Sequence, residues 1–321
     1  MHTIPAFQRY VRRLVYTVAQ PDWTTLEHQP RPWLYLHGGH SETLLQEVRS
    51  ICRHLNQQWV WRGLDDPRVA QAYRQGPLLV PLDAALYAHA LVHWLPQQAG
   101  LIVLGPEDGQ VLLQHLQRLR TVVASDGFAM PFSLHAARAL EELCEALPAQ
   151  RLAQFFGPIQ QLIWHTGGVP AGEWLCADAP ARPALAEPVP GEVPVQESSA
   201  LLTPAALSLT ESDEAALDQA SHAWLMRDCA REFRQRFPAY AAPEQQAQLW
   251  QKLLQFVQEA RAPLGFTKEA DLRHYMALRL AYPPACFAED SALWELLMNP
   301  QLDSQQRLSA AQAQLQAWME P

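Results

Sequence analysis

The string His37-Gly38-Gly39-His40-Ser41 comes closest to a catalytic motif. A His-Gly-Gly turn after a strand supplies oxyanion-hole amides in esterases, but that chemistry also needs a serine on a sharp G-x-S-x-G turn. No serine of the chain has glycine at both its −2 and its +2 position. We therefore interpret the string as a glycine turn from a strand into a helix that Ser41 caps. A hydrolase that uses the His37–Ser41 turn stays open as the less favoured alternative.

The second pattern with possible chemistry is the pair His89 and His93. Their i, i+4 spacing lets both imidazoles face one metal ion on a helix. The glutamate of an H-E-x-x-H site is missing, and the sequence suggests no third ligand nearby. We therefore interpret both as structural histidines, and we expect no metal and no other cofactor.

Two acidic patterns fit structural roles better than catalytic ones. Glu141, Glu142 and Glu145 share a predicted helix with leucines, and we interpret them as a solvated helix face. The stretch 105–109 (GPEDG) lies where a phosphate loop would sit, but it has neither spacing of such loops, and its acidic residues would repel a phosphate. With no catalytic constellation, we predict that the chain is not an enzyme.

Composition indicates a globular chain with few cationic groups. The 321 residues are 49% hydrophobic and suffice for about two domains. The net charge is −9, and residues 166–217 contribute one basic and eight acidic side chains. Phosphate backbones are bound by cationic surfaces, and the sequence contains no basic run. We therefore expect no nucleic-acid partner.

Cysteine usage and hydropathy predict a soluble, cytoplasmic protein. The five cysteines are an odd number without a C-x-x-C pair, which fits neither a disulfide framework nor a zinc site. The first 20 residues lack the apolar core of a secretory signal. Polar residues and a proline interrupt the most apolar stretch, 78–95, so we do not predict a membrane span.

Residues 1–166 are predicted to form an α/β lobe with a mixed, partly parallel sheet and flanking helices. An apolar stripe over 7–18 predicts a first helix. Short apolar runs then alternate with helical patterns, which is typical of β-α-β units. The predicted strands are 33–36, 59–61, 78–80, 101–104, 121–124 and 159–164. The predicted helices between them are 42–55, 83–95, 108–120 and 135–147.

The pattern changes after residue 166. Residues 167–204 hold seven prolines and little periodic apolar sequence, which predicts an acidic, partly stiff linker. Residues 205–321 are predicted to form an all-α helical bundle lobe without strands. Its predicted helices are 212–236, 244–261, 268–281, 289–298 and 304–318.

An ordered series of short motifs in the first lobe is similar to a known family. The series is Trp33-Leu-Tyr-Leu-His-Gly-Gly, Trp61-Arg-Gly-Leu, Gly76-Pro-Leu-Leu-Val-Pro-Leu, Ala99-Gly-Leu-Ile-Val-Leu, His115-Leu-Gln-Arg-Leu-Arg, the Val122–Gly127 turn, Phe132 and Phe155-Phe-Gly-Pro. It resembles the effector chaperones or adaptors of the bacterial type VI secretion system. The resemblance covers residues 33–165 well and the helical lobe more loosely. The family shows F-R-x-Y-D-P-R where this chain reads 132–138 (FSLHAAR), so a contact through that aspartate is lost here.

The resemblance implies a non-catalytic protein that acts by binding and release. Such adaptors hold a toxic effector in the producing cell and help load it onto the VgrG spike or its PAAR tip. We expect a partner helix or apolar segment to lie in a hydrophobic groove. The candidate anchors in that groove are Trp224, Phe233, Trp250 and Phe266, with core packing as the alternative for each. A structural scaffold of the secretion apparatus is the alternative function.

Overall fold

The computed structural model describes residues 15–52, 57–64, 66–167, 172–180, 207–288 and 291–319. The chain divides into two compact units, Met1–Ala220 and Ser221–Pro321. We describe each unit by itself. The division falls inside helix α8 (Glu211–Arg236), later in the chain than the boundary at residue 205 that the sequence predicts.

Seven strands of the first unit form one sheet in the order β1-β9-β8-β5-β2-β4-β3. Helices accompany this sheet, so the mixed α/β character predicted for the first lobe is observed. The strands are β1 (Val15–Val18), β2 (Pro32–His37), β3 (Gln58–Trp59), β4 (Pro77–Pro81), β5 (Gly100–Leu104), β8 (Gln161–His165) and β9 (Trp174–Asp178).

Every neighbouring pair in the seven-stranded sheet is antiparallel, so the prediction of a partly parallel sheet is wrong here. Strands β4 and β5 are connected through helix α4 (Ala84–His93), as in a β-α-β unit. Both pair antiparallel with β2, so they run in the same direction, but β2 lies between them. The crossover helix was therefore predicted correctly, whereas strand adjacency was not.

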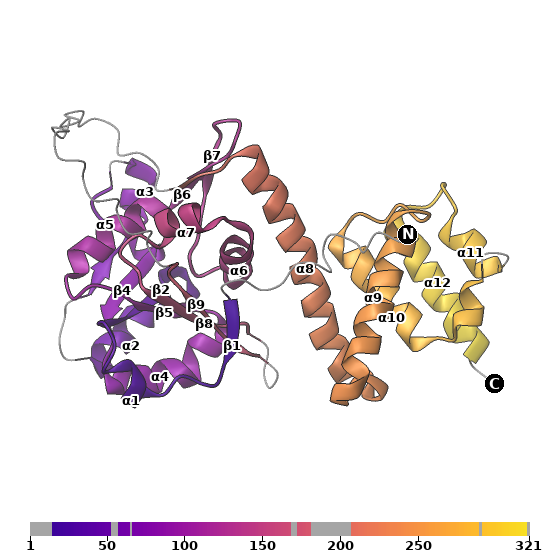
Figure 1. The fold of residues 1–321 in the computed structure, drawn as a ribbon, viewed down its shortest axis with the longest axis horizontal. Helices are drawn as coiled ribbons and strands as arrows, with labels where there is room; N and C mark the ends of the chain where they lie inside the picture. Colours follow the sequence, from indigo (N-terminus) through magenta and orange to yellow (C-terminus); the bar gives the residue numbers. More distant parts are fainter. Residues whose placement is uncertain are drawn as a thin grey trace, which may run out of the picture. The chain divides into compact units, whose positions relative to one another are not determined.

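Helices cover both faces of this sheet (Figure 1). Strand side chains alternate between the faces, so Tyr35 packs in one apolar cluster and its neighbour Leu34 in the other. The first cluster includes residues of α5 (Gly109–Leu119), α6 (Ala137–Ala146) and α7 (Ala149–Phe156); the second includes residues of α1 (Trp23–Leu26), α2 (Leu44–Ile51) and α4. Helix α3 (Pro67–Gln71) and 3-10 helices at Gly38–His40, Tyr73–Gln75 and Leu95–Gln97 complete the described helices of this unit.

Aspartate side chains cap the starts of α4 and α5. The Asp83 carboxylate accepts a hydrogen bond of 2.8 Å from the Leu86 N–H at the start of α4. The Asp108 carboxylate accepts one of 2.8 Å from the Gln110 N–H at the start of α5. Side chains that accept from these otherwise unpaired N–H groups favour helix initiation. The stretch 105–109 is thus a helix start, as its acidic residues suggested.

A second, three-stranded sheet has the order β10-β6-β7. Strand β6 (Thr121–Val123) pairs in parallel with β10 (Leu207–Ser208) and antiparallel with β7 (Ala129–Pro131). The strand at 207–208 contradicts the prediction that no strand follows residue 205. Its two residues are too few to give a period-two pattern that the sequence could reveal.

Two other predicted segments also differ from the structure. Residues 15–18, at the end of the helix predicted over 7–18, form edge strand β1 and pair with β9; residues 7–14 lie outside the described residues. Strand β9 lies inside the predicted linker 167–204, where its apolar run pairs with β8. Of that linker, residues 168–171 and 181–204 lie outside the described residues.

The second unit is helical, as predicted for the C-terminal region. After α8 it contains α9 (Gln246–Arg261), α10 (Glu269–Ala281), α11 (Ala292–Leu297) and α12 (Ser304–Met319), with 3-10 helices at Pro238–Tyr240, Pro243–Gln245 and Pro284–Phe287. Arg307 of α12 donates from Nη1 to the carbonyls of Leu264 and Leu297, at 3.0 and 2.8 Å. Among the described residues of the chain, none of the helices combines the length and the apolar character needed to cross a bilayer.

We predict that Gly100→Ala destabilises the first unit. A Cβ atom at position 100 would lie 2.1 Å from the carbonyl oxygen of Tyr35 in the β2–β5 ladder, so a central strand would have to shift. We expect the free energy of unfolding to fall by about 2–3 kcal/mol in urea denaturation. Gly105→Ala is the matched control, because its Cβ would meet Leu112 at 3.7 Å, an ordinary contact. Equal losses in both variants would contradict this explanation.

Candidate functional site

The His37–Ser41 string does not assemble a serine–histidine pair. The strand and glycine turn are present, since β2 ends at His37 and Gly38–His40 form a 3-10 helix. The Ser41 hydroxyl is 2.8 Å from the hydroxyl of Thr43 and accepts from the Thr43 N–H. Helix α2 has Thr43 at its N-cap position without a side-chain cap hydrogen bond, so Ser41, whose hydroxyl accepts from the Thr43 N–H, caps the turn that leads into the helix and not the first residue of α2 itself. His40 instead lies 3.2 Å from the Gln97 side chain.

His37 is part of a stacked histidine pair. Its ring lies 4.1 Å from that of His135, centroid to centroid, and the planes differ by 10°. The Nδ1 atom of each ring is buried without a hydrogen-bond partner among the described residues. Burial lowers the pKa of both rings; the charge of His40 adds to this effect at His37, and the charge of His37 adds to it at His135, whose pKa falls to about 4. The pair therefore acts as a neutral packing contact between the end of β2 and the segment before α6.

The His89–His93 pair lies on α4, as the spacing predicts, with ring centroids 4.3 Å apart. The Glu47 carboxylate lies 4.0 Å from His89 Nε2 and accepts from the Trp94 indole N–H at 3.2 Å. Burial lowers the pKa of His89, and the charge of His93 adds to this effect. Within the described residues, no group of three histidine, cysteine or carboxylate side chains has the arrangement of a metal site.

The glutamates of α6 differ from the solvated face that the sequence predicts. Glu141 and Glu145 are buried, with 2% and 1% of their surface exposed. Glu142 forms an ion pair with Arg138, whose Nε lies 2.7 Å from its carboxylate. Burial of two carboxylates on one helix is costly and needs compensating partners, which an isolated helical pattern cannot reveal.

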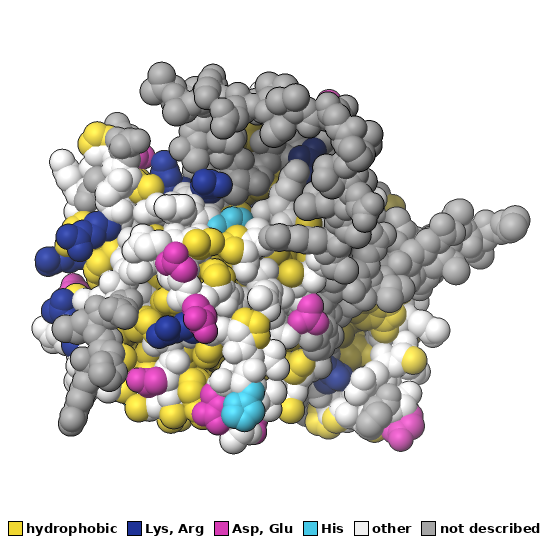
Figure 2. Space-filling view, turned by 60° about the vertical axis from the view of Figure 1, so that its left-hand side comes forward, with side chains coloured by type: hydrophobic (Ala, Val, Ile, Leu, Met, Phe, Trp, Pro, Cys, Tyr) yellow, Lys and Arg dark blue, Asp and Glu magenta, His cyan; other side chains and the backbone are white. Residues whose placement is uncertain are grey.

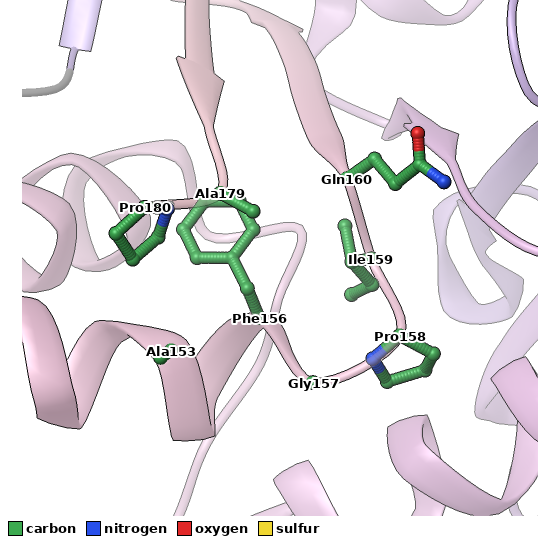
Figure 3. A pocket seen from close by; sticks show the side chains of 8 residues that line it. All are labelled: Ala153, Phe156, Gly157, Pro158, Ile159, Gln160, Ala179 and Pro180. Carbon is green, nitrogen blue, oxygen red and sulfur yellow. The ribbon is translucent and has the colours of Figure 1, made fainter. Parts of the chain in front are cut away.

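One surface cavity has an almost entirely apolar lining. This cavity, of about 420 Å³, opens beside the end of α7 and the start of β8 (Figure 3). Gln160 has the one polar side chain among the eight residues that line it, and its amide points away from Phe156 and Pro180. This lining can accept an apolar group. On the face drawn in Figure 2, acidic, basic and apolar side chains of the described residues are interspersed.

The four predicted anchors lie in the second unit and differ in exposure. Phe233 and Phe266 are fully buried, and Phe266 packs beneath the guanidinium of Arg307 at 4.8 Å. In this conformation their rings belong to the core and are inaccessible to a partner. Trp224 and Trp250 are half-buried.

Two of the large exposed apolar side chains lie on the β6–β7 hairpin of the first unit. Phe128 is 68% exposed and Met130 is 38% exposed. Phe132, next in the same alternation, packs against the core with its ring 6.0 Å from that of Phe155. We call Phe128, Met130 and Phe132 the apolar stripe. The hairpin stands out from the first unit near the start of α8 (Figure 1).

The turn of this hairpin is held by local hydrogen bonds. The Asp126 carboxylate accepts from the Phe128 N–H at 2.8 Å, and the Gly127 N–H donates to the Ala124 carbonyl at 2.9 Å. Gly127 has φ +85°, a left-handed conformation that glycine adopts without steric cost. A Ser-Asp-Gly turn is thus suited to place Phe128 at the tip.

Helix α8 supports the hairpin from its first turn. The Glu214 carboxylate accepts from both the Ser125 N–H and the Ser125 hydroxyl, at 2.8 and 2.7 Å. Asp213, one residue earlier, is buried and lies 3.5 Å from Arg151. These contacts hold a protruding turn on which Phe128 and Met130 are exposed.

The alternation of Phe128, Met130 and Phe132 after the Val122–Gly127 turn is the sequence signal for this site. Alternation predicts a strand with one apolar side, yet it does not tell whether that side faces a core or solvent.

Comparisons of the chain with protein-family models, curated proteins and solved structures give no match.

We predict that Glu214→Ala loosens the hairpin. The substitution removes two charge-assisted hydrogen bonds to Ser125, so we expect the free energy of local opening to fall by about 1–2 kcal/mol. Amide hydrogen exchange over residues 121–131 measures this directly. Glu211→Ala removes a carboxylate from the same helical turn and serves as the control. Unchanged exchange in Glu214→Ala would show that the helix does not support the turn.

We predict that the stacked pair makes stability depend on acid pH. Because the pKa of His135 is about 4 in the folded chain and about 6.5 when unfolded, the unfolded state binds the proton first as the pH falls. Between pH 6.5 and 4, unfolding is therefore accompanied by the uptake of about one proton at His135, and the free energy of unfolding falls as the pH falls. His135→Gln should reduce the slope of unfolding free energy against pH in this window. His28→Gln, at an exposed histidine, is the control, and an unchanged slope in His135→Gln would refute the assignment.

Proposed function

We propose that this chain is a non-catalytic chaperone or adaptor that binds a toxic type VI secretion effector in the producing cell. In this role it helps load the effector onto the VgrG spike or its PAAR tip. The proposal rests on the resemblance of residues 33–165 to adaptors of that system. Its partners are the effector and the spike proteins, and its work needs no bound cofactor.

The observation that best supports a binding role is the exposure of Phe128 and Met130 on a hairpin whose turn is held by hydrogen bonds. A solvent-exposed phenylalanine at 68% exposure is costly to keep in water, and its turn is fixed by Asp126 and Glu214 rather than left to collapse onto the core. Rigid aromatic anchors of this kind lose little conformational entropy on binding. The hairpin also lies within the segment that carries the resemblance.

The four aromatic residues predicted as anchors differ in their accessibility to a partner. Phe233 and Phe266 are core residues of the second unit, so we do not assign them a binding role. Trp224 and Trp250 keep partial exposure and remain candidates for a secondary contact. We assign the primary effector contact to Phe128 and Met130.

Co-expression of the tagged chain with the toxin encoded beside its gene tests this proposal. We expect a stable complex that keeps the toxin soluble. Phe128→Ser should weaken the complex by about 2 kcal/mol or more, because it removes a central apolar anchor. Val92→Ser is the control, since Val92 is 66% exposed on α4, outside the hairpin.

The alternative outcomes separate the candidate functions. If both proteins are folded and do not associate, the chaperone role is wrong. Binding of spike subunits in the absence of any effector would favour the structural scaffold.

A further inference from the structure

Among the described residues, no strand pairs with the outer edge of β7, so that edge of the small sheet is open. Strand β7 is the last strand in the order β10-β6-β7, and all three of its residues are exposed. An open strand edge presents backbone groups that another extended chain can pair with.

The hydrogen bonds of β6 give the direction of these groups. The Ala124 N–H donates to the Phe128 carbonyl and the Phe132 N–H to the Arg120 carbonyl, at 2.8 and 2.7 Å. Hydrogen-bonded and non-hydrogen-bonded pairs alternate in an antiparallel ladder, so the pair Val123–Ala129 is not hydrogen-bonded. Consistent with this, the Val123 carbonyl accepts from Leu209 on the opposite side of β6.

The open edge therefore offers the N–H and C=O of Ala129 and the C=O of Pro131. Proline has no N–H, so the edge has one donor and two acceptors. An incoming strand can satisfy both groups of Ala129 with one residue and donate its next available N–H to Pro131. The proline limits pairing without preventing it.

Side chains of the edge also favour an alternating partner. Phe128 and Met130 lie on the same face as the core residue Val122, which is opposite Met130 in the register. Ala129 and Pro131 lie on the other face. A strand added beside β7 would place every second side chain against Phe128 and Met130 and leave the others in solvent.

The charged side chains near the tip of the hairpin indicate which charge a bound partner segment would carry. Asp126 and Glu211 are exposed, and the half-buried Glu214 binds the turn, whereas the nearby Arg151 is paired with buried Asp213. Carboxylates in this arrangement complement a cationic residue of the partner. The edge is only three residues long, too small to hold two copies of this chain as a stable dimer by itself.

We propose that the effector, on the function proposed above, adds a β-strand to the open edge of β7. The added segment is extended, alternates apolar and polar residues, and carries a basic residue beside Asp126. Backbone pairing with Ala129 and Pro131 sets its register, and packing on Phe128 and Met130 selects its apolar side chains.

Ala129→Pro tests the pairing with little change to the fold. It removes the one outward N–H, while the β6–β7 ladder does not use that group. We expect the affinity of the chain for the co-purifying effector to fall at least about tenfold. Ala129→Ser is the matched control, because it keeps the N–H, and we expect it to bind as the unaltered chain does. Circular dichroism and the melting temperature verify that both variants fold.

Amide exchange of the unaltered chain provides a second readout that needs no variant. On complex formation with the effector, exchange of the Ala129 N–H should slow by about tenfold or more. A complex in which that amide exchanges as before, or in which Ala129→Pro and Ala129→Ser bind equally, overturns strand addition while leaving the chaperone role intact. Failure of the unaltered chain to bind any effector overturns both. Dimerisation that Ala129→Pro abolishes would instead identify a second copy as the occupant.

Discussion

Pairing of β2 along both of its edges is the constraint on which the first unit depends. This strand hydrogen-bonds to β4 on one side and β5 on the other, so it fixes the directions of both. Its residues from Pro32 to Leu36 are buried, and alternate side chains pack in the apolar clusters on the two faces of the sheet, so the helices on both faces pack against the same strand. Close approach of the β5 backbone is possible because Gly100 has no side chain beneath the Tyr35 carbonyl. The directions of β4 and β5 and the separation of the two apolar clusters follow from this arrangement.

Local sequence patterns predicted where helices and strands lie in the chain better than they predicted which strands pair and in which direction. The starts and ends of α4, α5 and α9–α12 lie within a few residues of the predicted ones, because caps and apolar periodicity are encoded locally. Strand direction was not predictable in the same way. Continuous apolar runs such as 101–104 report burial on both faces, which is common in parallel sheets but occurs here in an antiparallel one. Strand β9 escaped prediction because neighbouring prolines and acidic residues dominated the composition of its segment.

Of the candidate site, the sequence predicts the turn but not the exposure of the side chains beside it. Ser125-Asp126-Gly127 is readable as a turn, since each residue type has a local reason to be there. Exposure of Phe128 is not readable, because it depends on where the core ends, and that is set by distant helices α6 and α7. Phe233 and Phe266 were wrongly predicted to be exposed anchors for the same reason: an aromatic side chain fits a core as well as an interface, and the sequence does not distinguish the two.

The Arg307 contacts in the second unit have a consequence for biosynthesis. This side chain satisfies the carbonyl of Leu264 and that of Leu297, at the end of α11, yet it belongs to α12, which the ribosome makes after both. Until α12 emerges and docks, those two carbonyls must bind water or other groups, and Phe266 lacks the guanidinium stacked on its ring. The earlier helices of the unit therefore emerge as an incomplete core, and its cooperative folding is completed only when α12 is available.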